Sequence, residues 1–246
     1  MNREIIIQSI EKNLKDFYFS FKKGINSSFY QNDYLESIKS SWPSFVLLKD
    51  YNSDFEKVVK SLKNSQNTSK NWILDDKYVK NNQKLLKTKK MFPLNSWEGM
   101  YLFKDKQSEI KKVENFKVET LQKEDLQEFV SIVNSSVFHK NVISTEILLN
   151  IIDDDNFYFY VGKYKDKIVS TCLIFNNGVT NGLYFIATKD IFRGKGFAKN
   201  MVATTINNQI NNNSNHFILH ATKLGKGIYS NLGFKDYSKL IIFVKI

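Results

Sequence analysis

The chain is poor in metal-binding residues. Its 246 residues include one cysteine, Cys172, and three histidines, His139, His216 and His220. A single cysteine excludes an intramolecular disulfide and a cysteine-rich metal site. Because the histidines are scattered along the sequence, they do not indicate a zinc site either. We therefore expect no metal.

Long apolar runs and a concentrated basic segment are also missing. No hydrophobic stretch approaches the roughly 18 residues of a membrane span, and acidic and polar residues follow the first methionine at once, unlike a signal peptide. The net charge is +11, but the lysines are interspersed with acids and form no arginine-rich stripe. We expect a cytoplasmic protein without membrane or nucleic-acid partners, whose surface attracts small anions.

The chain does contain enough apolar residues, 42%, for a sizeable core. Around a short run typical of a buried strand, residues 183–187, the pattern is unusually informative. A polar turn follows, then a glycine-rich loop. A helical period begins at Phe197, with Ala198, Val202, Ile206 and Ile210 each four apart on one face, which predicts an amphipathic helix.

The loop between this strand and this helix, residues 193–198, is predicted to bind an anion. Its two glycines, Gly194 and Gly196, let the backbone come close to a ligand, and the first helical amides point outward. Arg193 and Lys195 add positive charge, so the expected ligand is a pyrophosphate. A Walker loop is excluded because Gly196 follows Lys195 where Ser or Thr is required. A dinucleotide fingerprint is excluded because Lys199 replaces its third glycine.

Two ordered motifs carry a family resemblance. Arg193, Gly196 and Ala198 fill the pattern Gln/Arg-x-x-Gly-x-Gly/Ala, and residues 219–234 end in Tyr-x-x-Leu-Gly-Phe, beginning at Tyr229. In both motifs, residues 116–246 resemble the GNAT superfamily of N-acetyltransferases. The resemblance implies acetyl-CoA as cosubstrate and a central strand that splays from the next one to admit the pantetheine arm.

The resemblance also implies roles for individual residues. Tyr229 matches the tyrosine that commonly protonates the departing thiolate, and a backbone amide within residues 186–188 would stabilise the oxyanion. The implied coenzyme-binding residues are Ile186, Ala187, Thr188, Arg193, Gly194, Lys195, Gly196, Phe197 and Ala198.

The general base is not identified, because many relatives carry a glutamate on the central strand and this chain has none between Asn181 and Thr188. His220 could serve, since its ordinary pKa suits neutral pH, although a lone strand histidine is more often structural. A water chain is another alternative. Cys172 lies in an apolar run without a cationic neighbour, which argues against a covalent acetyl-enzyme. The acidic candidates are Glu146, Asp153, Asp154 and Asp155.

The expected architecture is a mixed α/β sheet with helices on both faces, the GNAT-like acyl-CoA N-acyltransferase fold, preceded by a small α/β lobe. The polar stretch 104–115 is the candidate linker, so we predict an N-terminal lobe at 1–112 and the acetyltransferase domain at 113–246. The lobe could be a stabilising cap or a degenerate GNAT-like half, and in both cases it could wall the acceptor cleft.

Periodicity predicts the individual elements. We expect helices at 4–21, 53–62, 75–90, 123–133, 145–152, 197–210 and 225–232. We expect strands at 44–48, 72–74, 97–103, 116–121, 157–164, 168–175, 183–187, 217–222 and 240–246.

The resulting hypothesis is transfer of an acetyl group from acetyl-CoA to a primary amine by direct attack in a ternary complex. The acceptor, a small molecule or a peptide, stays open, and so does the oligomeric state. The alternative is a catalytically degenerate module that binds acyl-CoA or a partner. Turnover on a panel of amines would distinguish the two.

Overall fold

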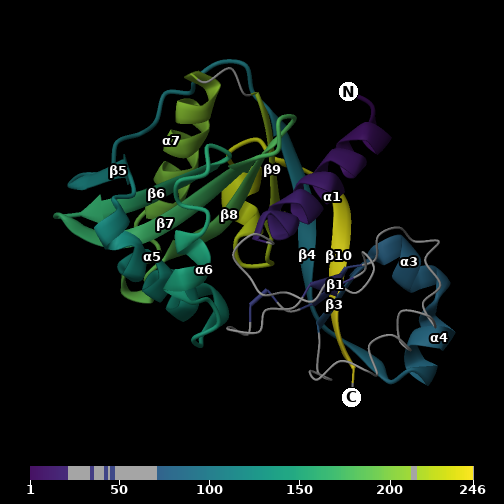
Figure 1. Cartoon of the computed structure of the whole chain (residues 1–246). Helices are drawn as coiled ribbons and strands as arrows, with labels where there is room; N and C mark the ends of the chain where they lie inside the picture. Colours follow the sequence, from purple (N-terminus) through teal and green to yellow (C-terminus); the bar gives the residue numbers. More distant parts are fainter. Residues whose placement is uncertain (22–33, 36–41, 44, 48–70, 212–214, 246) are drawn as a thin grey trace.

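The computed structural model describes the chain apart from residues 22–33, 36–41, 44, 48–70, 212–214 and 246 (Figure 1). Its described strands form one ten-stranded mixed sheet in the order β1-β2-β3-β10-β4-β9-β8-β7-β6-β5. The pairs β2–β3 and β8–β9 are parallel and the other pairs are antiparallel. The strands are β1 Tyr34–Leu35, β2 Phe45–Leu47, β3 Asn71–Asp75, β4 Met91–Phe103, β5 Phe116–Thr120, β6 Phe157–Tyr164, β7 Lys167–Asn176, β8 Asn181–Thr188, β9 His216–Ala221 and β10 Lys235–Lys245.

Helices cover both faces of this sheet (Figure 1). One face packs against α7 and α8, and the other packs against α1, α5 and α6. The alternation of strand residues explains the two layers: Cys172 faces α7, and its neighbour Leu173 belongs to the opposite core. The α-helices are α1 Arg3–Ser20, α3 Asp76–Asn81, α4 Gln83–Thr88, α5 Leu126–Val133, α6 Thr145–Leu149, α7 Phe197–Asn211 and α8 Lys226–Ser230; short irregular turns are η2 Lys123–Asp125, η3 Asn134–Phe138 and η4 Asp190–Phe192.

The long strand β4 joins the two halves of the chain. It lies between β9 and β10 and pairs with both of them. The sheet is therefore continuous across the boundary predicted near residue 112. The stretch that follows β4, residues 104–115, contains no helix or strand and runs along α7, where Ser108 and Asn207 exchange two hydrogen bonds of 3.0 and 2.8 Å. The division into two domains stays a prediction.

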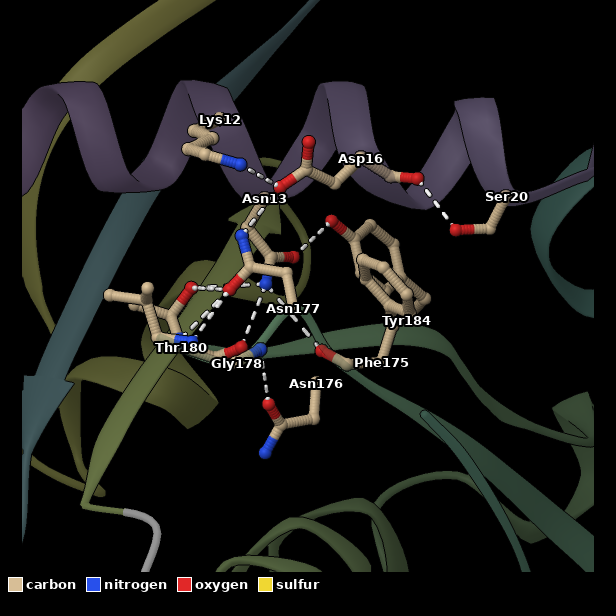
Figure 2. Close-up of polar contacts among 11 residues, drawn as sticks. Lys12, Asn13, Asp16, Ser20, Phe175, Asn176, Asn177, Gly178, Thr180 and Tyr184 are labelled. Carbon is tan, nitrogen blue, oxygen red and sulfur yellow. Dashed lines mark hydrogen bonds and ion pairs between the residues drawn. The ribbon is translucent and has the colours of Figure 1, made fainter. Parts of the chain in front are cut away.

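A buried polar network fixes α1 to the turn between β7 and β8 (Figure 2). The fully buried Asn13 donates from Nδ2 to the carbonyl oxygen and Oγ1 of Thr180, at 2.9 and 3.0 Å. Its Oδ1 accepts a hydrogen bond of 2.8 Å from the Tyr184 hydroxyl. At the surface of the same helix, Asp16 accepts from Asn177 Nδ2 at 2.7 Å. These bonds hold the first helix over the start of the central strand β8.

Several elements differ from the predicted ones. The last strand, predicted at 240–246, begins at Lys235, and the short strand β1 has no predicted counterpart. The helix predicted at 75–90 is two short helices, because the chain breaks at Asn82, whose Nδ2 bonds back to the Tyr78 carbonyl at 2.9 Å. The strand predicted at 97–103 begins at residue 91, and its early part includes Pro93 beside a register shift with β10, where proline is tolerated. The helix predicted at 53–62 lies outside the described residues.

Candidate active site

The central strands β8 and β9 separate at their carboxyl ends. They pair only between residues Asn181–Leu183 and Phe217–Leu219. β8 nevertheless continues to Thr188 and β9 to Ala221. The divergence leaves a split in the middle of the sheet, of the kind that can receive an extended ligand.

A bulge on β8 lies beside this split. Thr171 pairs with Ala187 and Leu173 with Tyr184, so Phe185 and Ile186 together face the single residue Cys172. Phe185 has a φ of 48°, which is unfavourable for an aromatic side chain. Its carbonyl oxygen accepts a hydrogen bond of 2.8 Å from Thr171 Oγ1. Backbone strain of this kind persists where the surroundings enforce it and is common at functional sites.

Of the three predicted strand residues, Ile186 is the second residue of the bulge, and Ala187 and Thr188 follow it. Ile186 packs toward the core under α7, and Ala187 packs toward the opposite core. The Ala187 carbonyl accepts a 2.8 Å hydrogen bond from Ser170 Oγ, which also lies 3.2 Å from Thr188 Oγ1. These bonds fix the end of β8 next to the split.

The glycine-rich loop lies between the end of β8 and the start of α7. Gly194 and Gly196 have φ angles of 76° and 81°, in the left-handed region that favours glycine. A Cβ on Gly194 would meet no atom within 4 Å, and one on Gly196 would meet only Val113 Cγ2, at 3.7 Å. The backbone is thus open to close approach, and the first amides of α7 have no partner within the helix.

The side chains of this loop have different surroundings. The Arg193 guanidinium donates to the carbonyls of Ser136 and Thr188, at 3.0 and 3.3 Å, and pairs with Asp190 at 2.8 Å. Arg193 therefore ties the loop to the protein, whereas Lys195 is exposed, with Nζ 5.3 Å from the centre of the Phe192 ring. Phe197 is buried and stacks on the Phe116 ring at 4.4 Å, which anchors the start of the helix.

Tyr229 lies on α8, on the same face of the sheet as α7. It is buried, and its ring lies 6.2 Å from that of Phe234. Burial raises the pKa of the Tyr229 hydroxyl, and Cys172, opposite the β8 bulge, raises it further. Tyr229 shares one buried cluster with Cys172, against which Ile186 of the bulge packs, although Ile186 and Tyr229 are 43 residues apart in sequence (229 − 186). Burial also raises the pKa of the Cys172 thiol to about 12, which keeps it protonated and argues against a nucleophilic role.

The acidic candidates for a base lie elsewhere. Residues 153–155 precede β6 at the end of the sheet where Phe157 pairs with Phe175, the end remote from the β8 bulge. Asp153 there pairs with Lys123 at 2.9 Å, and Glu146 is exposed in the first turn of α6. No carboxylate from this set is brought to the split.

His220 has a different position, on β9 just beyond the last pair with β8. Neither ring nitrogen has a hydrogen-bond partner, and burial lowers the pKa of the imidazole to about 4. Its ring lies 6.4 Å from that of Trp97 on β4. Among the described residues, no group of three His, Cys, Asp or Glu side chains could hold a metal ion, and no helix is long and apolar enough to cross a membrane.

The mixed sheet with a split between its central parallel strands is the fold of acyl-CoA N-acyltransferases. The family model described as "Acetyltransferase (GNAT) domain" matches residues 111–243, and the chain belongs to this family. The resemblance found in the sequence and the expected fold class are therefore confirmed. A comparison with curated proteins finds no match.

Solved structures share this fold at low sequence identity. A GCN5-related N-acetyltransferase from Kribbella flavida aligns over 96% of this chain and 95% of its own, with a TM-score of 0.71 and 9% identity. A functionally unknown conserved protein from Staphylococcus epidermidis aligns over 94% and 98%, with a TM-score of 0.61 and 10% identity. A GCN5-related N-acetyltransferase from Sphaerobacter thermophilus aligns over 72% and 59%, with a TM-score of 0.61 and 13% identity. The first two likenesses include the N-terminal half.

Proposed function

We propose that the protein transfers an acetyl group from acetyl-CoA to a primary amine by direct attack in a ternary complex. The observation that carries this proposal is the placement of the split, the β8 bulge and the open glycine loop along one continuous path. A coenzyme could lay its pyrophosphate on residues 193–198 and its pantetheine arm in the split, with the thioester at the bulge. Residues 186–198 would then hold the coenzyme largely through the backbone.

The chemistry asks for an oxyanion donor and a proton for the leaving thiolate. A backbone amide within residues 186–188 is the proposed oxyanion donor; losing one such donor typically lowers the rate about 10²–10³-fold. Tyr229 is the proposed acid. An ordinary phenol gives its proton to a thiolate at a cost of about 2 kcal/mol, and the raised pKa of Tyr229 adds to this cost unless the bound thiolate is equally shielded from water.

Calorimetry with acetyl-CoA, together with thiol release on a panel of primary amines, tests this proposal. Gly196→Trp should abolish coenzyme binding, because its side chain would fill the open face of the loop and its backbone would be strained. Tyr229→Phe should lower kcat about 10²-fold or more while coenzyme affinity changes little. Unchanged affinity in Gly196→Trp would show that the loop is not the pyrophosphate site.

A catalytically degenerate module that binds acyl-CoA is the second candidate. The absence of a carboxylate on β8 favours it, because the proton acceptor common in relatives is missing. Tight acetyl-CoA binding without turnover on any amine would decide for this candidate.

A further inference from the structure

Three neighbouring strands place His220, Gly99 and Ser238 in one row. Gly99 on β4 pairs with His220 on β9 and with Ser238 on β10, and paired residues point to the same side of a sheet. A Cβ on Gly99 would overlap Ser238 Oγ and lie 3.1 Å from Cγ2 of Ile10. Since Ile10 belongs to α1, the row lies on the face that carries α1.

Both polar side chains of this row lack partners. Nδ1 and Nε2 of His220 and Oγ of Ser238 are buried, and none of the three atoms makes a hydrogen bond. Buried polar groups are nearly always hydrogen-bonded, so three such atoms in one row across β9, β4 and β10 need a physical explanation. A guest that donates and accepts hydrogen bonds, such as an amine or a water molecule, would satisfy them.

The other histidine of β9 provides the contrast. His216, at the start of the strand, has Nδ1 2.6 Å from the Tyr101 hydroxyl and is thereby accounted for as a structural side chain. His220 instead lies at the end of β9 where the strand has left β8. Only the second histidine is both unpartnered and beside the split.

The row also lies on the opposite face from Tyr229. On β9, Leu219 and Ala221 belong to the core that contains Tyr229, whereas Ile218, which faces the same way as His220, packs against Ile6 and Ile10 of α1. Tyr229 could therefore protonate the thiolate from the α8 side of the sheet, while His220 contacts the amine on the α1 side.

Burial lowers the pKa of His220 to about 4, which keeps a lone pair free but makes the ring a weaker base, so it can take the proton only as the attacking nitrogen becomes acidic. Burial causes this lowered pKa, and no charged side chain from α1, β4 or β10 contributes to it. The ring is therefore neutral at physiological pH and has a lone pair available. Neighbours that pack around the row, Ile10 on α1 and Trp97 on β4, carry no titratable group.

We propose that His220 accepts the proton that the acceptor amine loses as it attacks the acetyl carbonyl, directly or through one water. This inference rests on the proposed N-acetyltransferase function. The new nitrogen–carbon bond forms while the carbon–sulfur bond breaks, the amine proton passes to His220, and the coenzyme thiolate takes the Tyr229 proton. Exchange with solvent then returns both side chains to their starting states.

The test compares His220→Gln with His139→Asn, a control that removes an exposed histidine whose left-handed backbone (φ 55°) asparagine tolerates. Thiol release from acetyl-CoA is measured with alkyl primary amines and with hydroxylamine, alongside acetyl-CoA affinity and the thermal midpoint. His220→Gln should lower kcat/KM for alkylamines about 10²–10⁴-fold, with coenzyme affinity within about twofold of wild type. The loss should be smaller for hydroxylamine, because its nitrogen gives up its proton more readily.

Each other outcome overturns the inference in a distinguishable way. Wild-type activity retained within threefold in His220→Gln refutes the role of His220 and leaves the acetyltransferase proposal standing. An equal loss for all acceptors that follows a lowered thermal midpoint assigns His220 a structural role. Wild-type protein without turnover on any amine refutes the acetyltransferase proposal itself, and with it the need for a proton acceptor.

Discussion

Residues 113–246, the second region, contain recognisable sequence motifs for the candidate site, whereas residues 1–112, the first region, contain none and contribute to the sheet. The second region carries both family motifs, and the structure gathers them around the split between β8 and β9. The first region carries no motif, yet its strand β4 fills the position between β9 and β10. Motifs mark residues that approach a ligand, whereas the strand that completes a sheet only needs to be apolar on the correct faces.

The first region also supports the strained residue of the second. Trp42 packs edge-on against Phe185 at 5.4 Å between ring centres. Phe17 on α1 stacks on Tyr184 at 3.7 Å and lies 5.9 Å from Phe185. An unfavourable φ at Phe185 is thus held by rings from a segment that precedes it by more than 140 residues. The two regions are coupled at the point where the proposed thioester lies.

The largest expected effect comes from separating the regions. A fragment of residues 113–246 lacks β3 and β4, so β9 loses one of its two neighbours and β10 loses both, which leaves unpaired strand edges. We expect this fragment to be unfolded or aggregated, by circular dichroism and size-exclusion chromatography, while the full chain is folded. A folded fragment that binds acetyl-CoA would instead support the predicted two-domain division.

A smaller but still large effect is expected from Trp42→Ala. Trp42 is 6% exposed, and truncation of a buried tryptophan typically costs about 3–5 kcal/mol. The free energy of unfolding in urea should fall by about this amount, and acetyl-CoA affinity should fall as well because Phe185 loses its support. Leu94→Ala, at a residue 64% exposed on β4, is the control and should change stability by about 0.5 kcal/mol or less. Unchanged coenzyme affinity in Trp42→Ala would show that residues 1–112 contribute to stability and not to coenzyme binding.

The sequence predicted much of this arrangement and missed specific parts of it. Periodicity located α1 and α7, each of which has one apolar face, and short apolar runs between polar turns located the strands from β5 to β9. It could not place β4 between β9 and β10, since strand order depends on contacts between distant residues. The early part of β4 was missed because residues 92–95 are exposed and show no alternation.

In the candidate site, too, local sequence patterns were predictable and contacts between distant residues were not. The glycine-rich loop and Tyr229 were predicted from the two motifs that the sequence shares with the GNAT family, and their roles stay proposals. That the Arg193 guanidinium is engaged by Ser136, Thr188 and Asp190 could not be read from the sequence. Nor could the unpartnered state of His220, because it depends on what the neighbouring strands β4 and β10 place around it.

An intermediate effect is expected from Asn13→Ala. The substitution leaves the buried Tyr184 hydroxyl without its acceptor and removes the donor to Thr180, and each unsatisfied buried group costs about 1–3 kcal/mol. We expect a loss of about 2–3 kcal/mol in unfolding free energy. Lys12→Ala breaks only the exposed ion pair with Asp16 and should cost less than about 1 kcal/mol. Equal effects of the two substitutions would show that the buried network does not join the regions.

The smallest effect concerns acid stability, and it tests whether His220 is neutral and shielded in the folded protein. Its pKa is about 4 in the folded protein, below the ordinary value of 6.5, so the unfolded chain binds more protons between these values. Stability from this group is therefore present above about pH 6.5 and is lost as the pH falls toward 4. Between pH 7 and pH 5 the loss should be about 1–2 kcal/mol, since one pKa unit corresponds to about 1.4 kcal/mol and part of the residue reaches solvent.

Urea unfolding of wild type and His220→Gln at pH 7 and pH 5 measures this loss of stability. The variant should lose less stability than wild type over this interval. An identical pH dependence in both proteins would mean that His220 is not neutral and shielded in the folded state, and would remove the electrostatic basis for its role as a proton acceptor.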